Sequence, residues 1–199
     1  MAQIISKEEV EKLMNIKGEV RGVALKAELE YIRDRKGEDG LKKLEDTLKE
    51  LGHPLTFKEV STAKFYPLGL WGLLLLCIQR LFGYKDEDFR EVGQFDVKLS
   101  IFIRLFLQSF LSLERAFGAA QIMWKKYFTV GDLKVVELNK KDRYIIVRLE
   151  NFALHPLHCQ TMIGQFTFAL KMILKGGGTC EETKCTFKGD KYHEFLLRW

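Results

Sequence analysis

Side chains that can bind a metal ion gather in the last quarter of the sequence. Three of the four cysteines lie between Cys159 and Trp199, together with His193 and several glutamates. Thiolate sulfur, imidazole nitrogen and carboxylate oxygen are the ligands that fill a closed tetrahedral zinc site. The sequence therefore predicts a zinc site, and its candidate ligands are Cys159, Glu182, Cys185 and His193.

Two local elements must position these four residues. Pro156 favours the first turn of a helix that carries Cys159 on its apolar face, and a hairpin after this helix supplies the other three. Side chains alternate along a strand, so a two-residue turn would put Cys185 and His193 on opposite faces. The zinc hypothesis therefore predicts an odd-length or bulged loop, and either a bend between Glu182 and Cys185 or a Glu182 that reaches in from the start of the strand.

Other side chains near these elements leave alternatives open. Cys180 in the hairpin, and His155 and His158 beside Cys159, are fallback ligands. The spacing is not that of paired zinc-finger cysteines, so ordinary half-buried thiols and a surface histidine are the alternative interpretation. The charged N-terminus, residues 1–11, lacks the apolar segment of a secretion signal. We therefore expect a cytoplasmic protein whose cysteines are thiols or metal ligands rather than disulfides.

The composition is that of a globular protein with one substantial core. The chain has 199 residues, of which 47% are hydrophobic and 30% are charged. The net charge is +5, but acidic and basic residues are interleaved and no nucleic-acid motif appears, so nucleic-acid binding is not expected. The longest apolar run, residues 66–78, is too short to span a bilayer. We expect a single domain over residues 1–199, with N-terminal helices at 1–60 and a ligand-binding core at 61–199.

Helical periodicity dominates the first two-thirds of the chain, and strand periodicity follows it. The sequence from Ser6 to Glu9 is a capping box that opens a helix, and Gly37 breaks a later one. Residues 133–138 and 143–149 alternate as strands. With the helix after Pro156 and the terminal hairpin they form a ββαββ unit. The predicted class is α+β, with an N-terminal and central helical layer packed on a C-terminal antiparallel sheet.

Aromatic side chains recur along the central helices. Trp71 follows Pro67 on one predicted helix, Phe102 and Phe106 stand four residues apart on another, and a further helix carries Trp124. Such a stripe is more typical of a core than of a pocket wall. The same side chains could wall an apolar pocket between helices and sheet, so Trp71, Phe102, Phe106 and Trp124 are the candidate pocket residues.

The spacing of the four candidate ligands resembles that of the 4-vinyl-reductase-type domain. This domain is the sensory module of phenol- and xylene-responsive transcription activators. The resemblance rests on Cys159, then Glu182 and Cys185, then His193, which stands where the last cysteine of that domain usually stands. It implies a structural zinc beside an effector pocket. The chain from about Lys17 to Trp199 is also similar to an uncharacterised bacterial family related to that domain.

More distantly, the predicted fold resembles haem-dependent nitric-oxide sensor domains and TRAPP vesicle-tethering subunits. The haem sensors need a proximal histidine on a helix, and no histidine lies between His53 and His155. Zinc rather than haem is therefore the expected cofactor. Leu138 falls near the position where phenol sensors place a polar aromatic residue, so phenol is not the expected effector.

These resemblances imply a zinc-stabilised sensory domain that binds a hydrophobic small molecule. The sequence carries no DNA-binding or ATPase segment, so we expect it to act in trans, as a homodimer or through a partner protein. The alternative is a protein-interaction scaffold similar to the TRAPP subunits. A third hypothesis is an enzyme acting on a vinyl or tetrapyrrole substrate. No dinucleotide-binding fingerprint or nucleophile–base set appears, so we do not expect an enzyme.

Overall fold

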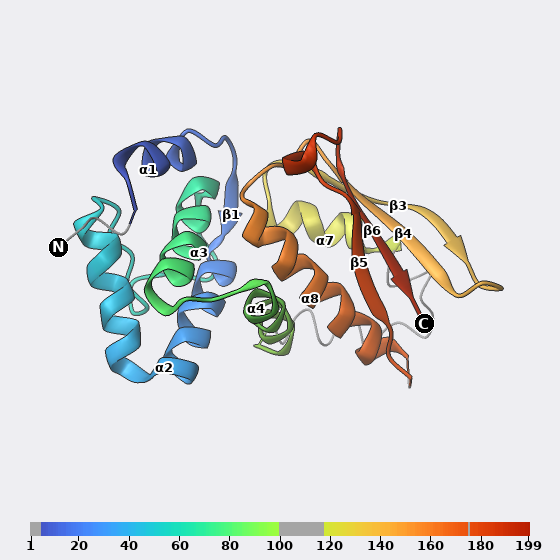
Figure 1. Ribbon diagram of the computed structural model, residues 1–199, viewed down its shortest axis with the longest axis horizontal. Helices are drawn as coiled ribbons and strands as arrows, with labels where there is room; N and C mark the ends of the chain where they lie inside the picture. The colour runs from blue at the N-terminus through green and yellow to red at the C-terminus, as the bar shows by residue number, and fades with distance from the viewer. Residues whose placement is uncertain (1–4, 100–117, 175) are drawn as a thin grey trace.

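The computed structural model describes residues 5–99, 118–174 and 176–199 (Figure 1). Its helices are α1 (Lys7–Met14), α2 (Gly22–Glu50), α3 (Leu68–Phe82), α4 (Asp86–Leu99), α7 (Ala120–Tyr127) and α8 (Pro156–Ile173), with a 3₁₀ turn η1 (Thr186–Lys188). Its strands are β1 (Glu19–Arg21), β2 (Phe65–Pro67), β3 (Asp132–Asn139), β4 (Tyr144–Glu150), β5 (Thr179–Lys184) and β6 (His193–Arg198). The predicted α+β class is confirmed.

The boundaries of the N-terminal helices follow their capping and glycine signals. The Ser6 hydroxyl accepts a hydrogen bond from the Glu9 amide, and the Glu9 carboxylate accepts one from the Ser6 amide, which completes the predicted capping box. Helix α2 is kinked at Gly37, whose φ is 71° and ψ is −175°. A positive φ is open to glycine without strain, so the predicted break is confirmed as a kink in the helix.

A four-stranded antiparallel sheet forms the C-terminal half, in the order β3-β4-β6-β5. The predicted ββαββ unit is confirmed, because α8 connects β4 to β5. One face of the central strands is fully buried, by Ile145, Val147, Leu149, Phe195 and Leu197. The Phe166 ring of α8 lies 5.3 Å from the Phe195 ring, so α8 covers this face. A small sheet of β1 and β2 was not predicted.

Helix α8 lies between α4 and the sheet (Figure 1). Its contact with α4 is made backbone to backbone through two glycines. A Cβ atom on Gly93 would lie 1.9 Å from the Thr161 carbonyl oxygen, and one on Gly164 would lie 2.0 Å from the Arg90 carbonyl oxygen. The position of α8, and with it that of Cys159, is therefore fixed from two sides.

Within residues 5–99, 118–174 and 176–199, the helices are too short or too polar to cross a membrane. The predicted helix that carries Phe102 and Phe106 lies outside the described residues.

Candidate metal centre

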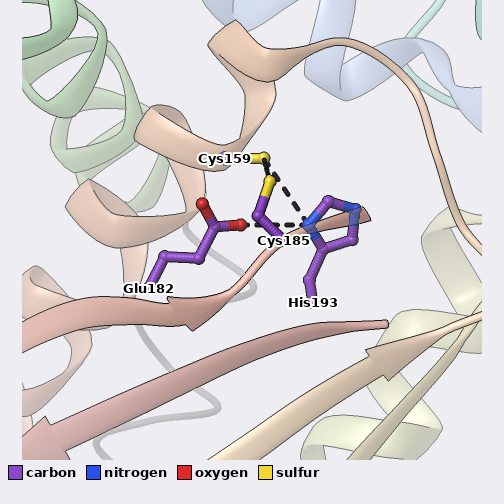
Figure 2. A group of neighbouring side chains, drawn as sticks. All are labelled: Cys159, Glu182, Cys185 and His193. Carbon is purple, nitrogen blue, oxygen red and sulfur yellow. Dashed lines mark hydrogen bonds and ion pairs between the residues drawn. The ribbon is translucent and has the colours of Figure 1, made fainter. Parts of the chain in front are cut away.

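The four predicted ligands converge on one small space between α8 and the terminal hairpin (Figure 2). One ligand atom from each of Cys159, Glu182, Cys185 and His193 lies within 4.8 Å of all the others. The Cys159 sulfur is 3.9 Å from the Cys185 sulfur and 3.6 Å from His193 Nδ1, and His193 Nδ1 is 3.0 Å from Glu182 Oε1. Two sulfurs, a nitrogen and an oxygen at these separations can surround a single metal ion.

The start of α8 places Cys159. His155 caps this helix: its Nδ1 accepts a hydrogen bond from the Leu157 amide at 3.2 Å, and Pro156 occupies the first turn. Cys159 follows one turn later and points toward the sheet, where its residue is 3% exposed.

A β-bulge aligns the ligands of the hairpin. Glu182 pairs with Phe195 while Lys184 pairs with Glu194, so Thr183 is an extra residue on β5. The bulge changes the alternation of side chains and brings Glu182 and Cys185 to the same side of the strand. This bend is one of the two alternatives that the zinc hypothesis predicted.

Neighbouring side chains hold two of the candidate ligands in place. Thr186 Oγ1 lies 2.8 Å from His193 Nε2, which leaves Nδ1 directed at the cluster. The Asp190 carboxylate accepts a hydrogen bond from the Cys185 amide at 2.8 Å and so ties the η1 loop to the site. Sequence reasoning missed both Thr186 and Asp190, since a threonine and an aspartate in a turn are too common to single out.

The protonation of the cluster depends on its burial. Burial raises the pKa of the Cys159 thiol, and the nearby Glu182 carboxylate raises it further. Burial also raises the pKa of Cys185. For Glu182, burial acts to raise the pKa, but hydrogen bonds with His193, Cys159 and Cys185 outweigh it, and the net shift is downward. The thiols are therefore neutral without a cation, and a cation would bind by displacing their protons.

The fallback ligands lie outside this cluster. Cys180 is half-buried on β5 and His155 caps α8. The ring of His158 packs edge-on against Trp71, with 4.8 Å between ring centroids, and lies 5.2 Å from the Phe152 ring.

The candidate pocket residues are described only in part. Trp71 and Trp124 both contact Phe128, at centroid distances of 5.8 and 4.0 Å, while Phe102 and Phe106 lie outside the described residues. Trp71 and Trp124 are both buried in this aromatic group. The pocket that these four residues would line stays a prediction.

Solved structures of the same fold exist, although no family model and no curated protein matches the sequence. One of them is an H-NOX protein from Shewanella oneidensis, in the Fe(II) form of a triple mutant. It superposes on this chain with a TM-score of 0.69 at 13% sequence identity, and the match covers 89% of this chain and 95% of that one. A structure described as an oxygen-binding H-NOX domain related to soluble guanylate cyclases gives a TM-score of 0.64 at 13% identity, covering 89% and 94%. The fold is that of the H-NOX proteins. The expected likeness to haem-dependent sensors is thus confirmed for the fold.

The expectation of zinc as the cofactor is contradicted by the structural neighbours, because the cofactor that two of their descriptions name is haem. One of them concerns haem redox potential and porphyrin distortion, and it matches with a TM-score of 0.64 at 14% identity over 90% of this chain and 99% of that one. The prediction relied on the chemistry and spacing of the four ligands, on a resemblance to the 4-vinyl-reductase-type domain and on the absence of a histidine between His53 and His155, and none of these identifies the cofactor of the fold.

The histidines and Cys77 nevertheless do not fit the role of an axial haem ligand. Haem iron takes an axial histidine, cysteine, methionine or tyrosine from the protein. Of the four histidines, His53 lies in the connection after α2, His155 caps α8, His158 packs against Trp71 and Phe152, and His193 belongs to the cluster. Residues 100–117 contain none of these four residue types. Burial raises the pKa of the Cys77 thiol to about 12, so this thiol stays protonated.

Proposed function

We propose that this chain is a small-molecule-binding sensory domain in which a divalent transition-metal ion ties α8 to the terminal hairpin. The observation that carries the metal part is the convergence of Cys159, Glu182, Cys185 and His193 within 4.8 Å. The sensory part is supported by the fold, since one structure of this fold is described as an oxygen-binding domain.

The donor set favours a structural role for the ion. Two thiolates, an imidazole and a carboxylate fill a tetrahedral coordination shell and leave no open position for a reactive water. The site is also closed, because Cys159, Cys185 and His193 are buried. Once the two thiols give up their protons to bind the ion, its positive charge pairs the negative charges that the thiolates and the carboxylate then carry in this buried place.

Helix α8 is the element through which the ion would affect sensing. Its first turn carries Cys159, and its middle packs backbone to backbone on α4 at Gly93 and Gly164. His158, next to Cys159, touches Trp71 of α3. A ligand that displaces α3 or α4 would therefore move α8, and the ion would transmit this displacement to β5 and β6.

Elemental analysis of the protein purified without chelator tests the metal site. We expect about one transition-metal ion per chain in the wild type. Cys159→Ser and His193→Ala should lose most of the ion, since each removes one of four ligands. Cys180→Ser is the matched control, because this thiol lies two residues before Glu182 but outside the cluster, and it should keep the ion. A wild-type protein free of metal would contradict the proposal.

Native mass spectrometry of the same preparation tests the sensory part. We expect a mass increment from a co-purified small molecule that is lost on denaturation. The same spectrum tests the predicted homodimer.

Kinship with the 4-vinyl-reductase-type domain, a cytoplasmic location and the absence of enzymatic activity stay predictions. The alternative of a TRAPP-like scaffold would be favoured by capture of a partner protein without any small molecule.

A further inference from the structure

The bulge in β5 allows two ligands of the metal centre to lie on the same side of the strand. Glu182 and Cys185 are three residues apart, and residues three apart point to opposite faces of a regular strand. With Thr183 as the extra residue, Glu182 lies opposite Phe195, which is buried under α8, and Cys185 follows on the same face (Figure 2). A strand without the bulge would turn one of the two ligands away from the site.

The side chain of the bulged residue is tied to the opposite strand. The Oγ1 hydroxyl of Thr183 lies 3.2 Å from the backbone carbonyl oxygen of Glu194 and 3.1 Å from Oε1 of the Glu194 carboxylate, so it can donate to either oxygen. A bulged residue is out of step with the backbone ladder. A side-chain donor that reaches the partner strand therefore holds the bulge at the point where the ladder is disrupted.

The acceptor of this bond is itself fixed, on the face of the sheet that points away from α8. Side chains alternate along β6, so Glu194 points away from the metal centre while its neighbour His193 points into it. Glu194 Oε2 accepts a hydrogen bond from Arg148 Nε at 2.7 Å, and Oε1 lies 3.6 Å from Lys184 Nζ. Glu194 is 7% exposed, and Arg148 is the residue directly opposite it on β4. A carboxylate with these charged partners is a well-defined anchor for the Thr183 hydroxyl.

We propose that Thr183 is a positioning residue of the metal centre: its hydroxyl, bonded to Glu194, holds the bulge that turns Glu182 and Cys185 toward the same ion. This inference rests on the proposed metal centre and adds that its coordination is set from the opposite face of the sheet. Thr186 and Asp190 orient a ring and a loop, whereas Thr183 sets the register of a strand. A register error of one residue removes one of four ligands.

NMR of the metal-free protein tests the hold on the bulge without the ion. In the wild type we expect nuclear Overhauser effects between the backbones of Glu182 and Phe195 and between those of Lys184 and Glu194, the pairs that flank the bulge. Thr183→Val keeps the branched shape but loses the hydroxyl. It should weaken the Lys184–Glu194 effects, because position 183 can then take the place opposite Glu194. Thr183→Ser keeps the hydroxyl and should retain the wild-type pattern.

Competition against a chromogenic chelator then measures the affinity for Co²⁺. We expect Thr183→Val to bind about 10–100-fold more weakly than the wild type, the loss typical of residues that orient metal ligands. Thr183→Ser should bind like the wild type. Thr179→Val removes an exposed hydroxyl from the same strand outside the bulge, and as the matched control it should also bind like the wild type. Circular dichroism checks folding, and Glu194→Ala, which removes the carboxylate acceptor and should also weaken binding, serves if Thr183→Val does not fold.

The outcomes separate this inference from the metal centre on which it rests. A wild type that binds no Co²⁺ contradicts the metal centre, and the Overhauser effects still show whether the hydroxyl holds the bulge. A wild type that binds Co²⁺ no more tightly than Thr183→Val overturns this inference alone. It is also overturned if Thr183→Ser loses as much affinity as Thr183→Val, or if Thr183→Val keeps the Lys184–Glu194 effects of the wild type.

Discussion

At the scale of single residues, His193 shows how a candidate ligand is oriented through both of its ring nitrogens. Its Nδ1 faces Glu182 and Cys159, and its Nε2 lies 2.8 Å from Thr186 Oγ1. A histidine ligand with a fixed second nitrogen has a defined tautomer and ring angle. The hydroxyl of Thr186 should therefore contribute to metal affinity without touching the ion.

Replacement of Thr186 by valine tests this contribution. Valine keeps the shape but removes the hydroxyl, and we expect the affinity for metal to fall by about 10–100-fold. Competition against a chromogenic chelator measures the affinity. Thr179→Val, at an exposed threonine on the neighbouring strand β5, is the control and should leave it unchanged. Equal affinities of the two variants would show that Thr186 plays no part in orienting the ligand.

The partly buried carboxyl group of Asp96 on α4 gives the stability of the protein a specific dependence on pH. The pKa of Asp96 is about 7 in the folded protein, above the value of about 3.9 for an unfolded aspartate. The folded state therefore binds more protons between these values. Stability from Asp96 is fully present below about pH 4 and is lost as the pH rises through about 7.

Urea denaturation of the wild type and of Asp96→Asn should reveal this dependence. Between about pH 4.5 and pH 8, we expect the free energy of unfolding of the wild type to fall by about 1–2 kcal/mol more than that of Asp96→Asn. This fall is smaller than the full shift in the pKa of Asp96 would give, because Asp96 is only half-buried. Parallel profiles of the two proteins would show that Asp96 does not titrate differently in the folded state.

At the scale of elements, the packing of α4 on α8 depends on two residues without side chains. An alanine at position 164 would place its Cβ 2.0 Å from the Arg90 carbonyl oxygen, so the two helices would have to separate. Since α8 also carries Cys159, a displaced α8 would disturb the metal centre as well as the core.

The substitution Gly164→Ala should lower the free energy of unfolding by about 3 kcal/mol, the upper part of the range for overpacked cores. Chemical denaturation measures the loss. Gly176→Ala is the matched control, because no atom lies within 4 Å of a Cβ there and the φ of Gly176 is not positive. A Gly164→Ala protein as stable as this control would mean that the two helices are further apart than described here.

Elements with strong local signals could be predicted from the sequence, while long-range features could not. Ser6 and Glu9 start α1 through contacts three residues apart, and the alternation around Val147 marks β4. The bulge at Thr183 was one of two alternatives under the zinc hypothesis but not visible in any local pattern. The buried hydrogen bond between Trp71 and Glu28 joins residues of two different helices, and in the sequence Glu28 looks like an ordinary polar residue of a helix.

At the scale of the whole molecule, the chain combines the H-NOX fold with histidines that do not fit the role of an axial haem ligand. His155 caps α8, His158 packs against Trp71, His193 belongs to the metal centre, and His53 lies in a connecting loop. The fold is therefore compatible with different ligands, because the side chains rather than the backbone select them.

Expression with a haem precursor tests this incompatibility. We expect the purified protein to lack Soret absorption and to bind added haem only weakly and without a defined ratio, because three of the four histidines are engaged and His53 lies in a connecting loop. One of the H-NOX proteins of the same fold, prepared in parallel, is the control and should be coloured. A stoichiometric haem complex of this chain would show that the engaged histidines rearrange.

The most direct test of the central claim is the absorption spectrum of the metal-free protein titrated with Co²⁺. We predict saturation at about one ion per chain, with a thiolate-to-cobalt charge-transfer band and strong visible absorption from a tetrahedral ion. The charge-transfer band should weaken in Cys159→Ser and persist in Cys180→Ser. A weak spectrum of octahedral cobalt without any thiolate band, identical in the wild type and Cys159→Ser, would contradict the metal centre described here.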